Sequence, residues 1–420
     1  MKTFDKVSLK IKKYKLLLTN FINLSFLQLF TIILPLLTYP YLIRVLGKDI
    51  FGLVVFSQSF MQYFIMFINY GFNISSTQEI ALNKENFKKK SEIISSTLIL
   101  KGILFLISIF LILILIFIIP ALKNNYLLFI FSISLLIQEV LFPTWYFLGI
   151  EKMKYITRIN ILSRSIFTIL IFVIIKTSSD YLLVPLISGA GGIIAGIYSL
   201  YILFYKEKYH FIVMSRTNLF SRLKKSTYYF LSNMSSIIYS NTGHIILGFN
   251  DSMAQVGFYD IGQKLLSLFK NFISVIEQTI FPNLTVSRNL KFFKNIFKIT
   301  LTITSLVLIL PILFSESLIT LIGGVEMLPA VKSFRIILLA AMPIVISIFY
   351  GHIFLLAWDK KEIFLKLKIL ALISYSILVI ICIVFFNVDA VSIAVIYLIN
   401  EIFVALICLV ISKKLMPIIK

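Results

Sequence analysis

The sequence has few of the residues on which cross-linked secreted domains and metal enzymes depend. Only two of its 420 residues are Cys, three are His and 14% are charged. Two Cys residues cannot supply the disulfide framework of a small secreted domain. Cys382 and Cys408 both lie in apolar runs with no second Cys beside them. We interpret them as small apolar residues of membrane helices.

Motifs for nucleotide and metal chemistry are also missing. The chain has no G-x-x-x-x-G-K-[ST] phosphate loop, no H-E-x-x-H and no paired-Cys metal motif. The sequence therefore predicts no ATP-driven engine, no metal site, no bound cofactor and no catalytic residues. We expect a protein that is not an enzyme.

What the chain has instead is apolar sequence. Apolar residues make up 59% of it, and its mean hydropathy is +0.99. A membrane-spanning helix takes about 20 such residues. This composition excludes a soluble globular protein and a disordered chain, and it predicts an all-α polytopic membrane protein.

Apolar runs bounded by charged clusters predict twelve transmembrane helices. The seventh and eighth contain enough polar residues that a simple hydropathy window would miss them. The predicted spans are residues 19–43, 50–74, 93–120, 125–148, 159–175, 181–205, 228–249, 256–281, 296–314, 333–357, 366–386 and 388–411.

The net charge of +22 is explained by the distribution of Lys and Arg over the predicted loops. With a cytoplasmic N-terminus, thirty of the 40 basic residues fall on the cytoplasmic side and six on the opposite side. This is the asymmetry of the positive-inside rule, and it predicts that both termini are cytoplasmic. The charge therefore does not indicate a nucleic-acid partner.

The basic segment 206–227 is the longest predicted cytoplasmic connection and divides the chain into two sets of six helices. We predict an N-terminal bundle over residues 1–205, a linker over 206–227 and a C-terminal bundle over 228–420. A weak internal repeat supports this division, because Gly52 and Gln58 have counterparts in Gly257 and Gln263 at a constant offset of 205 residues. Repeated halves are common in transporters.

The eighth predicted span carries a polar face. On a helical wheel Lys264, Lys270, Asn271 and Glu277 fall on the same side as Asp260. A charged residue near the membrane centre costs about 2.5 to 3.5 kcal/mol unless it meets water or a partner. The face therefore predicts a polar cavity, although structural charges satisfied by neighbouring helices would give the same pattern.

Polar stripes also follow the second and seventh spans. Gln58, Gln62 and Asn69 share one face of the second, and His244 ends a stripe of Ser and Asn in the seventh. Imidazole titrates near neutral pH, which makes His244 a candidate proton site, but a packed His is the alternative. The stripes could equally hold helices together. The run at 189–192, Gly-Ala-Gly-Gly, predicts a close helix contact in the sixth span.

Several motifs resemble one family of bacterial membrane proteins. Residues 35–47 read PLLTYPYLIRVLG, residues 70–73 YGFN, residues 143–149 PTWYFLG and residues 256–259 VGFY. These segments resemble the Wzx-type flippases of O-antigen and capsular polysaccharide repeat units, which belong to the polysaccharide transport family. The resemblance covers nearly the whole chain.

The resemblance implies a fold and a cargo. The fold would be that of the multidrug and toxic-compound exporters, with two six-helix bundles in a V around a central cavity. The cargo would be an oligosaccharide linked to undecaprenyl pyrophosphate, moved from the cytoplasmic to the periplasmic leaflet of the bacterial inner membrane and coupled to protons or Na⁺. A polysaccharide polymerase and a chain-length regulator are the implied protein partners.

We assign candidate roles from this resemblance and from the polar faces together. Pyrophosphate or acidic sugars would be bound by Lys264 and Lys270, with Arg44 and Arg164 as further candidates. Sugar contacts are expected from Gln58, Gln62, Asn69 and Asn271, and ion coupling from Glu277, Glu79 and His244. A lipid II flippase, a drug or cation exporter of the same fold, and a membrane-embedded polysaccharide polymerase remain as alternatives.

Overall fold

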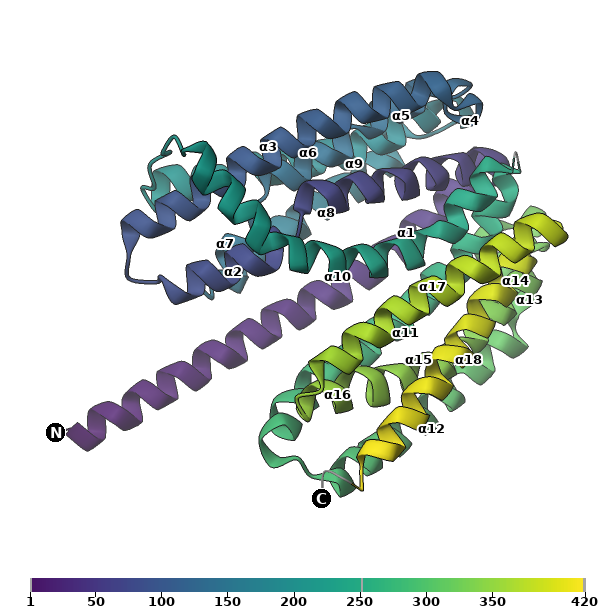
Figure 1. The fold of residues 1–420 in the computed structure, drawn as a ribbon. Helices are drawn as coiled ribbons and strands as arrows, with labels where there is room; N and C mark the ends of the chain where they lie inside the picture. Colours follow the sequence, from purple (N-terminus) through teal and green to yellow (C-terminus); the bar gives the residue numbers. More distant parts are fainter. Residues whose placement is uncertain (1, 251, 418–420) are drawn as a thin grey trace. The chain divides into compact units, whose positions relative to one another are not determined.

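The computed structural model describes residues 2–250 and 252–417, and in this part of the chain every regular element is a helix (Figure 1). The first elements are α1 (Lys2–Asn69), α2 (Phe72–Leu82), α3 (Phe87–Ile118), α4 (Pro120–Lys123), α5 (Tyr126–Ser132), α6 (Ser134–Leu141), α7 (Thr144–Gly149), α8 (Met153–Ile174), the 3₁₀ helix η1 (Ser178–Leu182), α9 (Leu183–Tyr201) and the π-helix η2 (Ile202–Lys206).

The remaining elements follow the basic segment. They are α10 (Arg216–Phe249), α11 (Met253–Ser287), α12 (Leu290–Leu313), α13 (Ser315–Gly323), the 3₁₀ helix η3 (Val325–Met327), α14 (Ala330–Leu339), α15 (Ala341–Ile346), the π-helix η4 (Ser347–Phe354), α16 (Leu355–Ala357), α17 (Lys361–Phe385) and α18 (Ala390–Leu415).

Nine segments of the described residues are long and apolar enough to cross a membrane. They are Leu37–Leu82, Phe87–Ile118, Tyr126–Gly149, Met153–Ile174, Ser178–Lys206, Leu290–Leu313, Ala330–Ala357, Lys361–Phe385 and Ala390–Leu415. The polar helices α10 and α11 are not among them, as expected for the seventh and eighth predicted spans. The all-helical membrane fold is confirmed, while the count of twelve spans stays a prediction.

Contacts along the chain define two compact units. The first unit contains Met1–Thr38 and Met61–Asn233, and the second contains Tyr39–Phe60 and Met234–Lys420. Helix α1 contributes to both, and it is interrupted at Gly47, whose φ of 77° is open to glycine but strained for other residues. The predicted division at residues 206–227 stays a prediction.

In the first unit, glycines bring α6 and α9 into close contact. A Cβ atom on Gly189 would lie 2.3 Å from Oγ of Ser134, and one on Gly192 would lie 2.2 Å from Oε1 of Gln138. Such distances leave little room for a side chain, so the backbone of α9 packs directly on the side chains of α6. The close contact predicted from the small residues at 189–192 is confirmed.

A buried ion pair also belongs to the first unit. Lys101 of α3 is fully buried, and its Nζ lies 2.8 Å from Oε1 of Glu139 and donates to the Glu139 carbonyl at 3.0 Å. A buried ammonium would be costly without such partners. The pair ties α3 to α6, and it was not anticipated from the sequence.

The second unit brings together the glycines of the internal repeat. A Cβ atom on Gly52 of α1 would lie 1.7 Å from the Met253 carbonyl oxygen and 3.2 Å from the Gly257 nitrogen in α11. The two helices therefore touch through their backbones at the positions that the repeat makes equivalent.

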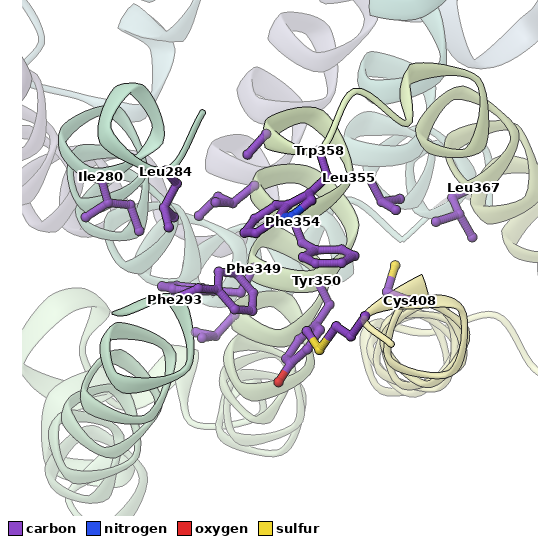
Figure 2. Close-up of a cluster of buried hydrophobic side chains, with 14 of the residues drawn as sticks. Ile280, Leu284, Phe293, Phe349, Tyr350, Phe354, Leu355, Trp358, Leu367 and Cys408 are labelled. Carbon is purple, nitrogen blue, oxygen red and sulfur yellow. The ribbon is translucent and has the colours of Figure 1, made fainter. Parts of the chain in front are cut away.

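A large apolar cluster consolidates the rest of the second unit (Figure 2). Phe354 and Trp358 lie at its centre, with their rings 4.7 Å apart. Leu284 of α11 packs on one side, and Leu367 of α17 and Cys408 of α18 on the other. The cluster fixes the π-helix η4 relative to α17 and α18.

Candidate functional site

A cavity of about 370 Å³ lies inside the second unit, bounded by α10, α11, α15, η4, α17 and α18. Its walls are mainly apolar, but Lys270 and Lys368 both line it, and we call it the lysine cavity. Its volume is within the range of about 300 to 1,000 Å³ that is typical of small-molecule sites. A smaller hollow of about 160 Å³ shares Ser236, Lys368 and Glu401 with it.

Lys270 belongs to a chain of buried polar groups between three helices. Its Nζ donates to the Tyr397 hydroxyl at 2.7 Å, and the Tyr239 hydroxyl donates to Oε1 of Glu401 at 2.8 Å. The rings of Tyr239 and Tyr397 stack with centroids 5.4 Å apart. The lysine and the carboxylate thus lie in one network of α10, α11 and α18 without a direct ion pair among the described salt bridges.

The wall of the lysine cavity also carries a second lysine and a histidine. Nζ of Lys368 in α17 donates to Oγ of Ser236 in α10 at 3.2 Å. His352 of η4 contacts the carboxylate of Glu277 through Nδ1. π-helical segments occur often at functional sites, and here the π-helix places His352 at the cavity wall.

Another polar cluster surrounds His244 of α10. Its Nε2 lies 3.1 Å from Oδ1 of Asp260 in α11, and both side chains are buried. The Lys264 ammonium sits 4.7 Å from the ring centroid of Tyr39, which lies next to Asp260. Within the described residues, His244 Nδ1 is buried without a hydrogen-bond partner.

The other candidate residues lie in different surroundings. In the second unit, Gln58 and Asn271 are half-buried, while Arg44 is exposed and donates to the Leu321 carbonyl of α13. In the first unit, Arg164 is half-buried in α8.

Three more candidates belong to the first unit. Glu79 of α2 forms an ion pair with Arg222, with 2.7 Å between Oε2 and Nη2. Gln62 is exposed, and Asn69 has a buried Oδ1 without a hydrogen-bond partner among the described residues. The structure thus brings Lys270 to a cavity and His244 to a carboxylate, and it pairs Glu79 with a cation.

Sequence reasoning missed four members of these clusters, Asp260, His352, Lys368 and Glu401, as site residues. Glu401 was visible in principle, since a carboxylate within an apolar span is rare and marks function by default. Lys368 was counted with the cytoplasmic basic residues although it lies at the start of the predicted span 366–386, and α17 already begins at Lys361.

Among the described residues no group of three or more His, Cys, Asp or Glu could hold a metal ion. The ion pairs and cavity walls described above contain isolated carboxylates and lysines and no cluster of metal ligands.

Solved structures define the class of the fold. A multidrug-resistance MATE family transporter of the MOP superfamily, in an inward-facing conformation, matches with a TM-score of 0.73 and 13% identity over 92% of this chain and 95% of its own. The lipid II flippase MurJ, in an inward closed conformation, matches with a TM-score of 0.71 and 16% identity over 93% and 87%. The chain has the fold of these membrane transporters.

Sequence relatives narrow this class to a family. The model of the family described as "Polysaccharide biosynthesis protein" matches residues 17–288. A protein of Escherichia coli (strain K12) named "Putative O-antigen transporter" is 30% identical over 361 residues, which cover 84% of this chain and 86% of its own. A protein of the same name from Shigella dysenteriae is 29% identical over 60% of this chain and 63% of its own.

The chain belongs to this polysaccharide biosynthesis protein family, and the resemblance inferred from its motifs is confirmed. It is a multi-pass protein of the bacterial inner membrane and a transporter, not an enzyme.

Proposed function

We propose that the chain is a flippase for oligosaccharide repeat units linked to undecaprenyl pyrophosphate, which it moves from the cytoplasmic to the periplasmic leaflet. The observation that carries the proposal is the match to a curated relative named as an O-antigen transporter over most of both chains. The transporter fold and the buried lysines support it, because an ammonium can neutralise a diphosphate where water is scarce.

The proposal includes twelve transmembrane helices in two six-helix bundles with both termini in the cytoplasm. The nine candidate spans support this count once three further helices are added. These are the polar helices α10 and α11 and the part of α1 that precedes Gly47. The asymmetry of Lys and Arg between alternate loops supports the orientation.

Transport proceeds by alternating access coupled to an ion, and we favour the proton. The His244–Asp260 pair supports this choice, since an imidazole beside a carboxylate can take up and release a proton in transport. Lys264 and Lys270 contact the pyrophosphate or acidic sugars, and amides such as Gln58 and Asn271 contact sugar hydroxyls. A polymerase and a chain-length regulator act on the same repeat units after transfer.

The test is deletion of the gene in its host, followed by extraction of lipid-linked repeat units and assignment of the leaflet that exposes their sugar. Complete repeat units should accumulate on the cytoplasmic leaflet. Lys270→Ala should fail to rescue, whereas Lys298→Ala, an exposed lysine of α12, should rescue fully.

Three results would replace the proposal with a rival. Repeat units that reach the periplasmic leaflet but do not polymerise would identify a polymerase. Accumulated peptidoglycan precursors would identify a lipid II flippase. Normal repeat-unit transfer with increased drug sensitivity would identify an exporter.

A further inference from the structure

The lysine cavity combines two chemistries that seldom occur together inside a protein. Most of its wall is hydrocarbon, including Ile344, Ile348, Phe364, Val404 and Cys408. Yet two ammonium groups, from Lys270 and Lys368, border the same space. A ligand that fills this cavity well must be apolar over most of its surface and anionic at one end.

The two lysines are not neutralised by direct partners. Among the described salt bridges neither Lys270 nor Lys368 takes part, and their hydrogen bonds go to hydroxyl groups of Tyr397 and Ser236. Glu401, the carboxylate that lines the cavity, accepts a hydrogen bond from Tyr239. Glu277, which contacts the wall residue His352, is the carboxylate that acts on Lys368, as Glu401 is for Lys270. Among the described residues neither carboxylate forms a direct ion pair with these lysines, so both ammonium groups stay available to the phosphates of an anionic ligand.

Close packing supports part of the cavity wall. A Cβ atom on Gly351 would lie 2.7 Å from Sγ of Cys408, so η4 and α18 meet closely at one side of it. Leu367 and Cys408 belong both to the cavity wall and to the cluster around Phe354 and Trp358 (Figure 2). The aromatic cluster packs behind this part of the wall and supports it, and the apolar wall suits a hydrocarbon chain.

Its position along the helices also agrees with loading from the cytoplasmic leaflet. Lys368 is seven residues from the start of α17, a rise of about 10 Å at about 1.5 Å per residue. In the proposed topology this end of α17 is cytoplasmic, so the ammonium lies near the depth at which a lipid phosphate meets the acyl region.

We propose that the lysine cavity binds the pyrophosphate of a polyprenyl pyrophosphate together with its first isoprene units, with Lys270 and Lys368 on the phosphates and the apolar wall against the chain. The inference rests on the proposed function, since it names the part of that substrate which this site recognises. Sugars bind elsewhere, because the wall offers mainly hydrocarbon to them. Free pyrophosphate binds weakly, because it leaves the apolar wall empty.

The experiment measures binding of geranylgeranyl pyrophosphate to the purified full-length chain in nanodiscs, with geranylgeraniol and inorganic pyrophosphate as competitors. Ala371→Phe fills the cavity from α17 and should weaken binding at least tenfold. Ile373→Phe, two residues along on an exposed part of the same helix, should leave binding unchanged. Lys368→Gln should weaken binding about tenfold, as loss of one charged hydrogen bond would, and Lys368→Arg should restore most of it.

Melting temperatures of the unliganded variants separate lost binding from lost folding. The inference is overturned if Ala371→Phe folds and binds as tightly as the wild type, or if inorganic pyrophosphate competes as well as the prenylated compound. Repeat-unit transfer is measured separately in cells. A chain that binds the probe but transfers no repeat units contradicts the proposed function and keeps the site, whereas one that transfers repeat units but does not bind the probe contradicts the site alone.

Discussion

Gly52 and Gly257 pack against each other in the second unit, and a Cβ atom added to Gly257 would lie 3.6 Å from the Cα atom of Gly52. The two residues occupy equivalent places in the internal repeat, 205 positions apart. The weak internal repeat thus coincides with a contact between two helices, and at Gly52 an added Cβ atom would lie 1.7 Å from the Met253 carbonyl oxygen, which leaves room only for glycine.

Replacing Gly52 by Ala should weaken this contact. The new methyl group cannot remain 1.7 Å from the Met253 carbonyl oxygen, so the helices must separate, at a cost of about 1 to 3 kcal/mol typical of overpacking. The measurement is the melting temperature of the purified protein in detergent. Gly102→Ala is the matched control, because nothing lies within 4 Å of its added Cβ atom. Equal melting temperatures for the two variants would refute the close contact.

The buried Lys101–Glu139 pair gives a second prediction about stability. Lys101→Met leaves the half-buried Glu139 carboxylate and the Glu139 carbonyl without their partner and should cost about 1 to 3 kcal/mol. Lys89→Met, in the same helix, breaks the exposed pair with Glu92 and should cost less than about 1 kcal/mol. Unfolding in detergent compares the two.

A double variant sharpens this test. Lys101→Met combined with Glu139→Gln removes both charges and should recover part of the lost stability, because the half-buried carboxylate is no longer left without its partner. If the double variant is less stable than Lys101→Met by the full effect of Glu139→Gln alone, the two residues do not interact.

The sequence allowed prediction of those features that depend on neighbours along one helix. Hydropathy predicted the membrane helices, and the wheel placed Lys264 and Lys270 on one polar face of what is α11. The polar residues of the seventh and eighth predicted spans also explain why α10 and α11 are not among the candidate membrane spans.

Features that depend on distant residues could not be predicted in this way. The partner of Lys270 is Tyr397, 127 residues away, and that of Tyr239 is Glu401, 162 residues away. Helix periodicity says which face a lysine occupies but not which helix packs on it. The lysine cavity follows from the packing of several helices, and Lys368, at the start of a predicted span, could not be assigned to it from its own helix alone.

The proposed topology predicts which loops can be labelled from outside. Single cysteines at Asn124 and Ser179 should react with an impermeant maleimide on intact spheroplasts, because both positions are exposed and lie in predicted periplasmic loops. Cysteines at Lys88 and Lys361 should react only after permeabilisation. The background replaces Cys382 and Cys408 by Ala, and both are buried. The opposite labelling pattern would invert the orientation, and labelling of all four would contradict the span count.

If His244 carries the coupling proton, replacing it should remove the dependence of transport on a pH gradient without unfolding the protein. Nε2 of His244 lies 3.1 Å from Oδ1 of Asp260, and Nδ1 has no hydrogen-bond partner among the described residues. His244→Gln keeps a donor for Asp260 but cannot titrate, so its melting temperature should change little. In proteoliposomes, an imposed pH gradient should accelerate transfer of a lipid-linked oligosaccharide by the wild type at least tenfold more than by His244→Gln. His210→Gln, at an exposed position before α10, is the control and should respond as the wild type does. If His244→Gln responds to the gradient as fully as His210→Gln, the coupling proton is carried elsewhere.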